Sequence, residues 1–329
     1  MKQVTVFGGS GVVGRHVVSR LAARGLVVRV AVRDVAAAGL VKPMGDVGQV
    51  TPVRANILDE EAVAAAVEGS HSVINLVGIL YGRGRQRFDA IHREGAERIA
   101  RLSKDAGVKH FVQMSALGAS LTSPSQYASS KAAGEEAVRK AFEGASVVRP
   151  SVIFGPDDDF FNQFAAIARL SPFLPVFGCP FPTFSSGSID LYGSGGTKFQ
   201  PVYVGDVADA IVACLYCDNA AGQTYELVGP TVYSFKQLMQ LVLNVTDRKC
   251  LLLPVPFWAA SMKALFLELL PKPLLTRDQV KLLKSDNVFS GSAPVLETLG
   301  ITPTAAELIV PTYLDRFRRG GRFHEAQTN

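Results

Sequence analysis

A glycine-rich segment near the start of the chain is the feature that most constrains the fold. It has the spacing G-x-x-G-x-x-G, with Gly8, Gly11 and Gly14 at the fixed positions, and it lies between an apolar run at 4–7 and a helix-like run at 16–22. Strand, glycine loop and helix in this order form the setting in which such a spacing binds a dinucleotide. The three glycines permit a tight turn, close approach of the backbone to a pyrophosphate, and close packing of helix and strand.

The helix that follows the loop adds free backbone N–H groups and the positive end of its dipole to this predicted site. Phosphates are therefore expected to lie against the loop and the first helical turn. The residues assigned to this contact are Gly8, Ser10, Gly11, Val12, Val13, Gly14 and Arg15.

The end of the second expected strand, at 27–33, is the position that reads the ribose in dinucleotide folds. Arg33 and Asp34 both stand there. An arginine favours the 2′-phosphate of NADP(H), whereas an aspartate favours the free 2′-hydroxyl of NAD(H). Because Arg33 comes first and Arg15 adds a second positive charge, the sequence favours NADP(H) over NAD(H). Asp34 is then explained as a turn or cap residue.

Strands and helices continue to alternate through the first half of the chain, which predicts a parallel sheet with helices on both faces. The fold class is therefore α/β, a Rossmann-type doubly wound parallel sheet with a smaller C-terminal α/β lobe. We place the dinucleotide-binding core at 1–150 and the lobe at 151–329, with some of its strands and helices packing back on the core. Expected strands lie at 50–55, 72–76, 108–114 and 146–149, and an expected helix at 90–106.

The ends of the third and fourth expected strands supply further candidates for the cofactor site. The loop after the third strand often lies against the adenine in dinucleotide folds, which points to Asn56 and Ile57. The fourth strand ends beside the expected cofactor, which adds Leu76, Val77 and Gly78.

A tyrosine and a lysine four residues apart, Tyr127 and Lys131, share one face of a predicted helix. Ser123 is expected to cap this helix, with Gln126 completing a capping box. A neighbouring ammonium favours the phenolate, so the pKa of Tyr127 is expected to move toward neutral. Tyr127 is then a candidate acid or base, Lys131 a candidate ligand of the nicotinamide ribose, and Ser115 a candidate to orient a substrate carbonyl.

Together, the glycine spacing, Ser115 and Y-x-x-x-K resemble the short-chain dehydrogenase/reductase superfamily, in its extended or atypical branch. The stretch Gln200 to Val207 resembles that branch's passage from strand to helix in the C-terminal region. The resemblance implies catalytic roles for Ser115, Tyr127 and Lys131, roles that nucleotide binding alone would also explain. It adds Pro150 and Ile153 to the cofactor-site candidates.

Several stretches, spread over nearly the whole chain, are similar to a narrower family, the NADPH-binding accessory subunits of respiratory complex I (alpha subcomplex subunit 9). They lie at 150–155, 161–165, 200–207, 275–280 and 296–301. This resemblance implies a non-catalytic NADPH-binding subunit that supports assembly or stability near the membrane junction, with other subunits of complex I as partners. The alternative is an active NADP-dependent reductase or epimerase that acts on a hydrophobic carbonyl substrate.

Two C-terminal segments are candidates for contact with a partner or a membrane surface. Residues 257–270 place Trp258, Met262, Leu265, Phe266 and Leu269 on one helical face, which fits either a core-facing helix or an interface. Residues 316–323 form a basic, aromatic tail, which fits a solvated end or an acidic surface. The net charge of +5 is mild and no nucleic-acid motif accompanies it, so nucleic acid is not an expected partner.

The four cysteines have no framework spacing, which favours a reduced compartment. Cys214 and Cys217 are expected to be buried thiols, because no second pair stands at zinc spacing and no metal site is expected. The first expected strand begins about three residues after Met1, which leaves no room for a signal peptide. With the resemblance to complex I, this predicts a peripheral position on the cytoplasmic face of a bacterial inner membrane, or the matrix side in an organelle.

Overall fold

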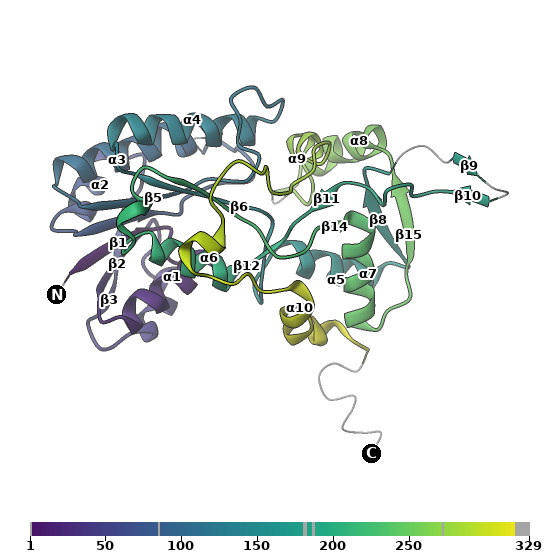
Figure 1. The fold of residues 1–329 in the computed structure, drawn as a ribbon, viewed down its shortest axis with the longest axis horizontal. Coiled ribbons are helices and arrows are strands. Elements are labelled where there is room, and N and C mark those ends of the chain that lie inside the picture. Colours follow the sequence, from purple (N-terminus) through teal and green to yellow (C-terminus); the bar gives the residue numbers. More distant parts are fainter. Residues whose placement is uncertain (1, 85, 180–182, 186–187, 272, 320–329) are drawn as a thin grey trace, which may run out of the picture. The chain divides into compact units, whose positions relative to one another are not determined.

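The protein is described from a computed structural model, which covers residues 2–84, 86–179, 183–185, 188–271 and 273–319. The chain folds into two compact units. The first unit consists of residues 1–150, 204–227 and 290–302, and the second of 151–203, 228–289 and 303–329. Figure 1 shows the elements along the chain. Among the described residues, no helix combines the length and the apolar character that crossing a membrane requires.

The first unit is built on a parallel sheet of seven strands within the described residues, in the order β13-β6-β5-β4-β1-β2-β3. The strand order reverses between β1 and β4, which is the switch point where dinucleotides bind in doubly wound folds. The predicted fold class is confirmed. The strands are β1 Gln3–Phe7, β2 Val27–Val32, β3 Val50–Arg54, β4 Ser72–Asn75, β5 His110–Met114, β6 Ser146–Pro150 and β13 Thr224–Leu227.

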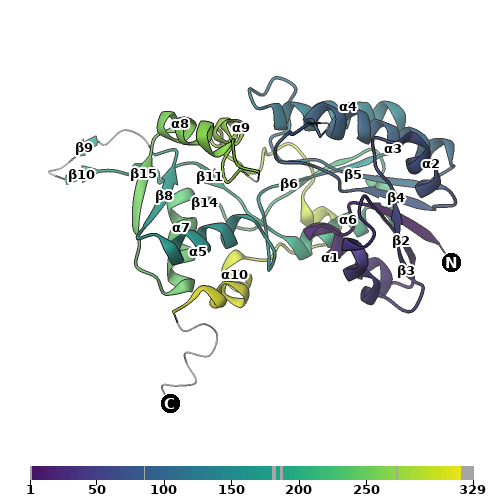
Figure 2. The same ribbon diagram turned by 180° about the vertical axis from the view of Figure 1, so that it is seen from behind.

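Helices cover both faces of this sheet (Figure 1 and Figure 2). The helices α2, α3 and α4 lie on one face, and α1 packs against α6 on the other. The side chains between the sheet and the first group are apolar, including Phe7, Ile99 and Phe111. The helices are α1 Val12–Ala23, α2 Glu60–Val67, α3 Ala96–Asp105, α4 Gln126–Ala141 and α6 Val204–Ala213, with short turns η1 Ala37–Met44, η3 Asp218–Ala220 and η4 Leu296–Leu299.

One local prediction in this unit is confirmed with a refinement, and one is corrected. The segment 90–106 is helical as predicted, but it begins as a π-helix, η2 Asp89–Gly95, and becomes α-helical at Ala96. The N-cap of α4 is Ser125, whose Oγ accepts the Ala128 N–H at 3.3 Å, so the predicted cap at Ser123 is wrong. Ser123 Oγ instead accepts the Ser125 N–H at 3.2 Å and shapes the turn before the helix.

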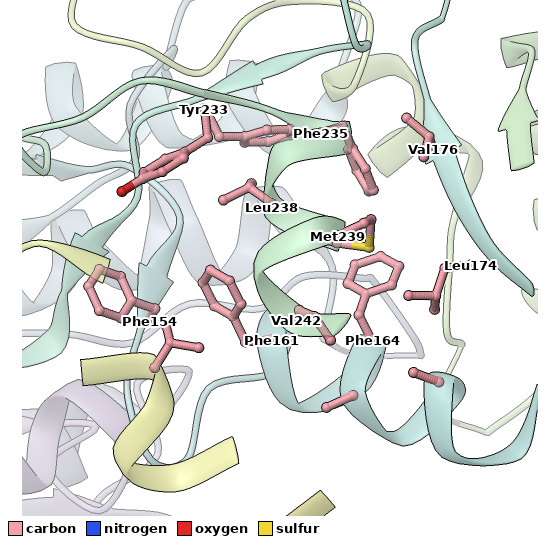
Figure 3. Packing of buried hydrophobic residues seen from close by; sticks show 14 of the residues in the cluster. Phe154, Phe161, Phe164, Leu174, Val176, Tyr233, Phe235, Leu238, Met239 and Val242 are labelled. Carbon is pink, nitrogen blue, oxygen red and sulfur yellow. The ribbon is translucent and has the colours of Figure 1, made fainter. Parts of the chain in front are cut away.

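The second unit packs a helical layer against short strands around an aromatic core (Figure 3). Phe161 and Phe164 on α5 meet Phe235 and Met239 on α7, and the rings of Phe164 and Phe235 contact edge to face at 5.6 Å. The helices are α5 Phe160–Leu170, α7 Phe235–Thr246, α8 Phe257–Leu267, α9 Arg277–Leu282 and α10 Ala306–Leu314, followed by η5 Asp315–Phe317. The paired strands are β7 Ile153–Phe154 with β12 Val202–Tyr203, β8 Phe173–Phe177 with β15 Leu251–Val255, β9 Thr183–Ser185 with β10 Ser188–Asp190, and β11 Lys198–Phe199 with β14 Tyr233–Ser234.

Candidate dinucleotide site

The glycine loop has the backbone geometry that phosphate binding needs. Gly8 has φ +78°, and its carbonyl accepts the Gly11 N–H at 3.1 Å, which closes the turn after β1. A Cβ on Gly14 would lie 2.4 Å from the Gly8 oxygen, so only glycine lets α1 approach the loop this closely. Gly11 is the N-cap of α1 and brings no side chain to it, which leaves the N–H groups of the first turn available to an anion.

The two candidate ribose readers after β2 have different surroundings. Asp34 is exposed, and its Oδ1 accepts the Ala37 N–H at 3.0 Å, so this carboxylate is engaged in the turn that leads into η1. Arg33 is exposed directly at the strand end. Arg15 is partly buried in the first turn of α1, with its Nε buried. Of the cap or turn role expected for Asp34, the turn role is observed.

The loop after β4 is held rigidly beside the switch point. Asn75 donates to Gln113 Oε1 at 2.9 Å and accepts the Val77 N–H at 3.1 Å, while Leu76 is buried. Gly78 is exposed, and a Cβ on it would lie 3.0 Å from Lys131 Nζ. The structure therefore brings this loop and the tyrosine–lysine helix together.

The predicted adenine contacts divide into a surface residue and a core residue. Asn56 is exposed, and its Oδ1 accepts the Leu58 N–H at 3.1 Å. Ile57 is 5% exposed and packs in the apolar core, while its carbonyl accepts from Arg98 at 2.8 Å. Pro150 ends β6, and its carbonyl accepts the Leu117 N–H. Ile153 lies in the second unit, and a part for it in nucleotide binding stays a prediction.

Ser115, Tyr127 and Lys131 all belong to the first unit. Ser115 follows β5 and is 3% exposed, and its Oγ has no hydrogen-bond partner among the described residues. Lys131 is 4% exposed and donates to the Met114 carbonyl at 3.3 Å, one residue before Ser115. A buried hydroxyl without a partner costs free energy unless something fills the site. The residues therefore fit a nucleotide whose ribose and carboxamide supply hydrogen-bond partners.

Burial dominates the ionisation of the tyrosine–lysine pair. It raises the pKa of Tyr127 to about 12, so the expectation that Lys131 moves this pKa toward neutral is wrong for the unliganded protein. The Lys131 ammonium lies 5.9 Å from the centre of the Tyr127 ring. Burial lowers the pKa of Lys131 to about 8, although the Glu135 carboxylate opposes this change.

The buried ammonium makes Lys131→Met a stabilising substitution in the unliganded protein. Because the folded pKa of Lys131 is about 8 and the unfolded value is 10.5, the unfolded state binds more protons between these pH values. We expect the variant to be more stable at pH 7 by roughly 3 kcal/mol, and the gain to vanish as the pH rises from 8 to 10.5. Urea unfolding of both proteins across this pH range measures the difference. An equal or lower stability of the variant at pH 7 would contradict this account of the site.

A histidine that the sequence analysis did not select lies at the centre of the site. His92 in η2 is 3% exposed, and it contacts the Tyr127 ring edge to face at 5.5 Å. Burial lowers the pKa of His92 to about 2, so the ring is neutral. No motif signals this residue, because its place depends on the π-helical turn that carries it.

The cysteines differ in exposure. Cys214 is buried, whereas Cys217 is exposed, so the prediction of a buried thiol is wrong for Cys217. The reason is that α6 ends at Ala213, before the pair. Within the described residues, no cluster of three or more His, Cys, Asp or Glu side chains could hold a metal ion.

Comparison with known proteins agrees with this geometry. The sequence model of the NAD dependent epimerase/dehydratase family matches residues 4–227 and supports a nicotinamide cofactor. Among solved structures, a triphenylmethane reductase from Citrobacter sp. is 19% identical, with a TM-score of 0.72 over 95% of this chain and 99% of the other. A Thermus thermophilus UDP-glucose 4-epimerase in complex with NAD is also 19% identical, with a TM-score of 0.68 over 96% and 98%. These likenesses show the fold.

Sequence relatives narrow the assignment. The chain is 34% identical to the Arabidopsis thaliana protein NADH dehydrogenase (ubiquinone) 1 alpha subcomplex subunit 9, over 96% of this chain and 78% of the relative. The Mus musculus protein of the same name is also 34% identical, over 95% and 80%. A ceramide reductase from Caulobacter vibrioides is 30% identical, over 77% of this chain and 73% of the relative. The chain therefore belongs to the NAD dependent epimerase/dehydratase family and, within it, to the family of the alpha subcomplex subunit 9 proteins.

Proposed function

We propose that this chain is an accessory subunit of respiratory complex I that binds NADPH as a structural component and does not turn it over. The observation that carries the proposal is the extent of the similarity to the subunit 9 proteins, which covers 96% of this chain and so includes both units. A bound nucleotide stabilises a protein because it binds the folded state alone. The buried Ser115 hydroxyl, which has no hydrogen-bond partner in the part of the chain that the structure describes, and the buried Lys131 ammonium are features that such a ligand would stabilise.

The charges after β2 favour NADP(H) over NAD(H). Arg33 is exposed at the strand end, where the ribose is read, and Arg15 adds a second guanidinium group in the first turn of α1. The Asp34 carboxylate is engaged with the Ala37 N–H. Guanidinium groups bind phosphate by charge-assisted hydrogen bonds, which supports recognition of a 2′-phosphate.

The helix α8 offers a surface for peripheral membrane contact. Its inward-facing side chains are small, since Ala260 and Ala264 are its buried residues. Phe257 packs against the apolar core, whereas five other large apolar side chains on α8 or just after it are exposed, which agrees with an interface and corrects the alternative of a helix whose apolar face is turned to the core. We call these side chains the α8 face; they are Trp258 at 67% exposure, Met262 at 56%, Leu265 at 43%, Phe266 at 66% and Leu269 at 81%.

Basic side chains occur on α8 and on the helix that packs against it. Lys263 is on α8 itself, and Lys281 and Lys284 are exposed on or just after α9. An exposed apolar helix face together with exposed lysines suits an anionic lipid surface. In the basic tail, residues 320–323 lie outside the described residues, while Arg318 donates to the Val245 carbonyl at 2.7 Å. We infer a peripheral position at the inner membrane, on the cytoplasmic face in a bacterium or the matrix side in an organelle.

Native fractionation of mildly solubilised membranes tests the assembly. The tagged chain is expected to migrate with NADH:ubiquinone oxidoreductase activity, and mass spectrometry of that fraction should identify the other subunits. The purified chain should bind NADPH more tightly than NADH. A chain that occurs only in the soluble fraction, free of that activity, would overturn the proposed function.

The alternative, an active reductase, is favoured by one observation: Ser115, Tyr127 and Lys131 are all retained in one unit. One relative of this chain, from Caulobacter vibrioides, is named a ceramide reductase, which supports a reductase activity as the alternative. In this role the cofactor would supply a hydride to a carbonyl carbon, Tyr127 would give its proton to the oxygen, and Ser115 would orient that oxygen. Oxidation of NADPH by the wild-type chain with a hydrophobic carbonyl compound, lost in Tyr127→Phe, would establish this activity.

A further inference from the structure

His92 joins the two parts of the candidate site that lie next to the switch point. Its Nε2 accepts the Ile79 N–H at 3.0 Å, in the loop that carries Gly78. Its Nδ1 lies 2.8 Å from Ser130 Oγ on α4, between Tyr127 and Lys131 in sequence. One side chain therefore contacts both the loop after β4 and the tyrosine–lysine helix.

The partners of the ring fix its proton. A backbone N–H can only donate, so Nε2 must be the acceptor, and the proton of the neutral ring is on Nδ1. Ser130 donates its own hydroxyl proton to the Tyr127 carbonyl at 2.9 Å, which leaves its oxygen free to accept from Nδ1. In this series each group accepts from the one before it and donates to the next: Ile79 donates to His92, His92 to Ser130, and Ser130 to the α4 backbone.

The backbone that carries His92 is itself held against α4. A Cβ on Gly134 would lie 2.0 Å from the His92 carbonyl oxygen, so the two backbones are in direct contact. The π-helical turn Asp89–Gly95 sets the ring at this point. The contact leaves little room for the loop and the helix to shift independently.

We propose that His92 is a positioning residue for the nicotinamide half of the bound nucleotide, because it fixes the loop that contains Gly78 relative to the helix that carries Lys131. The inference rests on the proposed nucleotide binding. In a doubly wound sheet the dinucleotide crosses the switch point, with one half over β1, β2 and β3 and the other over β4 and β5. The residues that His92 joins lie on the β4 and β5 side, whereas Arg33 and the α1 first turn serve the other half.

Binding of NADPH and of 2′,5′-ADP, which lacks the nicotinamide half, separates this role from a general loss of structure. In His92→Leu, the Ile79 N–H and Ser130 lose their partner, and we expect NADPH affinity to fall by about tenfold or more. The affinity for 2′,5′-ADP should stay unchanged. His92→Gln, whose amide can accept from Ile79 and donate to Ser130, should restore most of the NADPH affinity. Equal losses for both ligands, or none, in a folded His92→Leu would overturn the proposal.

Two further measurements keep the test independent of how well His92→Leu folds. Ser130→Ala keeps the ring but removes its acceptor, and it should weaken NADPH binding and leave 2′,5′-ADP binding intact. Nitrogen-15 NMR should show the wild-type His92 ring to be neutral, with its proton on Nδ1, at pH 6. A proton on Nε2 would contradict the assigned hydrogen bonds. A wild-type chain that binds 2′,5′-ADP but no NADPH would refute the nicotinamide role, and one that binds neither would refute the proposed function itself.

Discussion

Replacing Gly11 by aspartate is expected to abolish NADPH binding without destabilising the unliganded fold. Gly11 has φ −72° and ψ 177°, which any residue adopts, and a Cβ there would lie 3.3 Å from the Gly8 oxygen, a tight contact that a small shift of the loop relieves. Aspartate is a favoured N-cap residue, so α1 should tolerate it well. Its carboxylate would, however, accept the first-turn N–H groups and repel the phosphates that need them.

Thermal unfolding with and without NADPH measures both halves of this prediction. At a nucleotide concentration one hundred times the Kd, the wild type should gain about 2.7 kcal/mol, and Gly11→Asp should gain nothing. Gly14→Ala is the contrasting variant, because its Cβ would lie 2.4 Å from the Gly8 oxygen and should destabilise the fold even without nucleotide. Stabilisation of Gly11→Asp by NADPH would show that the nucleotide does not use this helix N-terminus. In the complex, Gly11→Asp should also impair assembly, and normal assembly would speak against a structural nucleotide.

The second large effect is expected on the α8 face. A variant with Trp258→Ser, Phe266→Ser and Leu269→Ser should lose binding to vesicles that contain anionic lipid. Burying one large apolar side chain contributes about 1.5–3 kcal/mol, so removal of three should lower the partition coefficient more than a thousandfold. Because all three side chains are at least 66% exposed, the folded unit should remain intact. Sedimentation with vesicles of phosphatidylcholine and phosphatidylglycerol measures the partition.

The control for this variant is a set of equally exposed apolar side chains elsewhere in the same unit. Leu170 is 82% exposed at the end of α5, and Leu308 is 69% exposed on α10. Leu170→Ser with Leu308→Ser should bind vesicles as the wild type does. Wild-type binding to vesicles should also weaken as the salt concentration rises, since salt screens the attraction between the exposed lysines on or near α8 and α9 and the anionic lipid. Equal losses of vesicle binding in the control and the α8 variant would show that the α8 face is not the membrane-binding surface.

The sequence was sufficient to predict the fold class and the glycine loop, because both depend on local signals. The alternation of apolar strands with helices and the spacing of Gly8, Gly11 and Gly14 are visible within short windows. The sequence did not decide whether Trp258 and its neighbours are buried or exposed, since a helix with one apolar face can direct that face toward the core or toward solvent. The small residues Ala260 and Ala264 face the protein, and this choice depends on packing with other elements.

The features that could not be predicted depend on contacts between distant parts of the chain. His92 becomes central because a π-helical turn places it between Ile79 and Ser130, and helical periodicity does not foresee such a turn. The pKa of Tyr127 was predicted from its neighbour Lys131, but burial outweighs that neighbour and raises the pKa to about 12. The cap of α4 was displaced by two residues because serines at 123 and 125 both suit the position.

The order in which the chain is synthesised gives the last strand of the large sheet a particular importance. β13 pairs with β6, and the Glu226 N–H is bonded to the carbonyl of Pro294, so the sheet edge is completed by segments more than seventy residues after β6. While a ribosome has made only the first 150 residues, β6 presents a bare edge, which is a hazard for aggregation. Contacts between such distant residues also slow folding. A nascent chain therefore completes this edge late, and a chaperone that shields β6 until then would protect it.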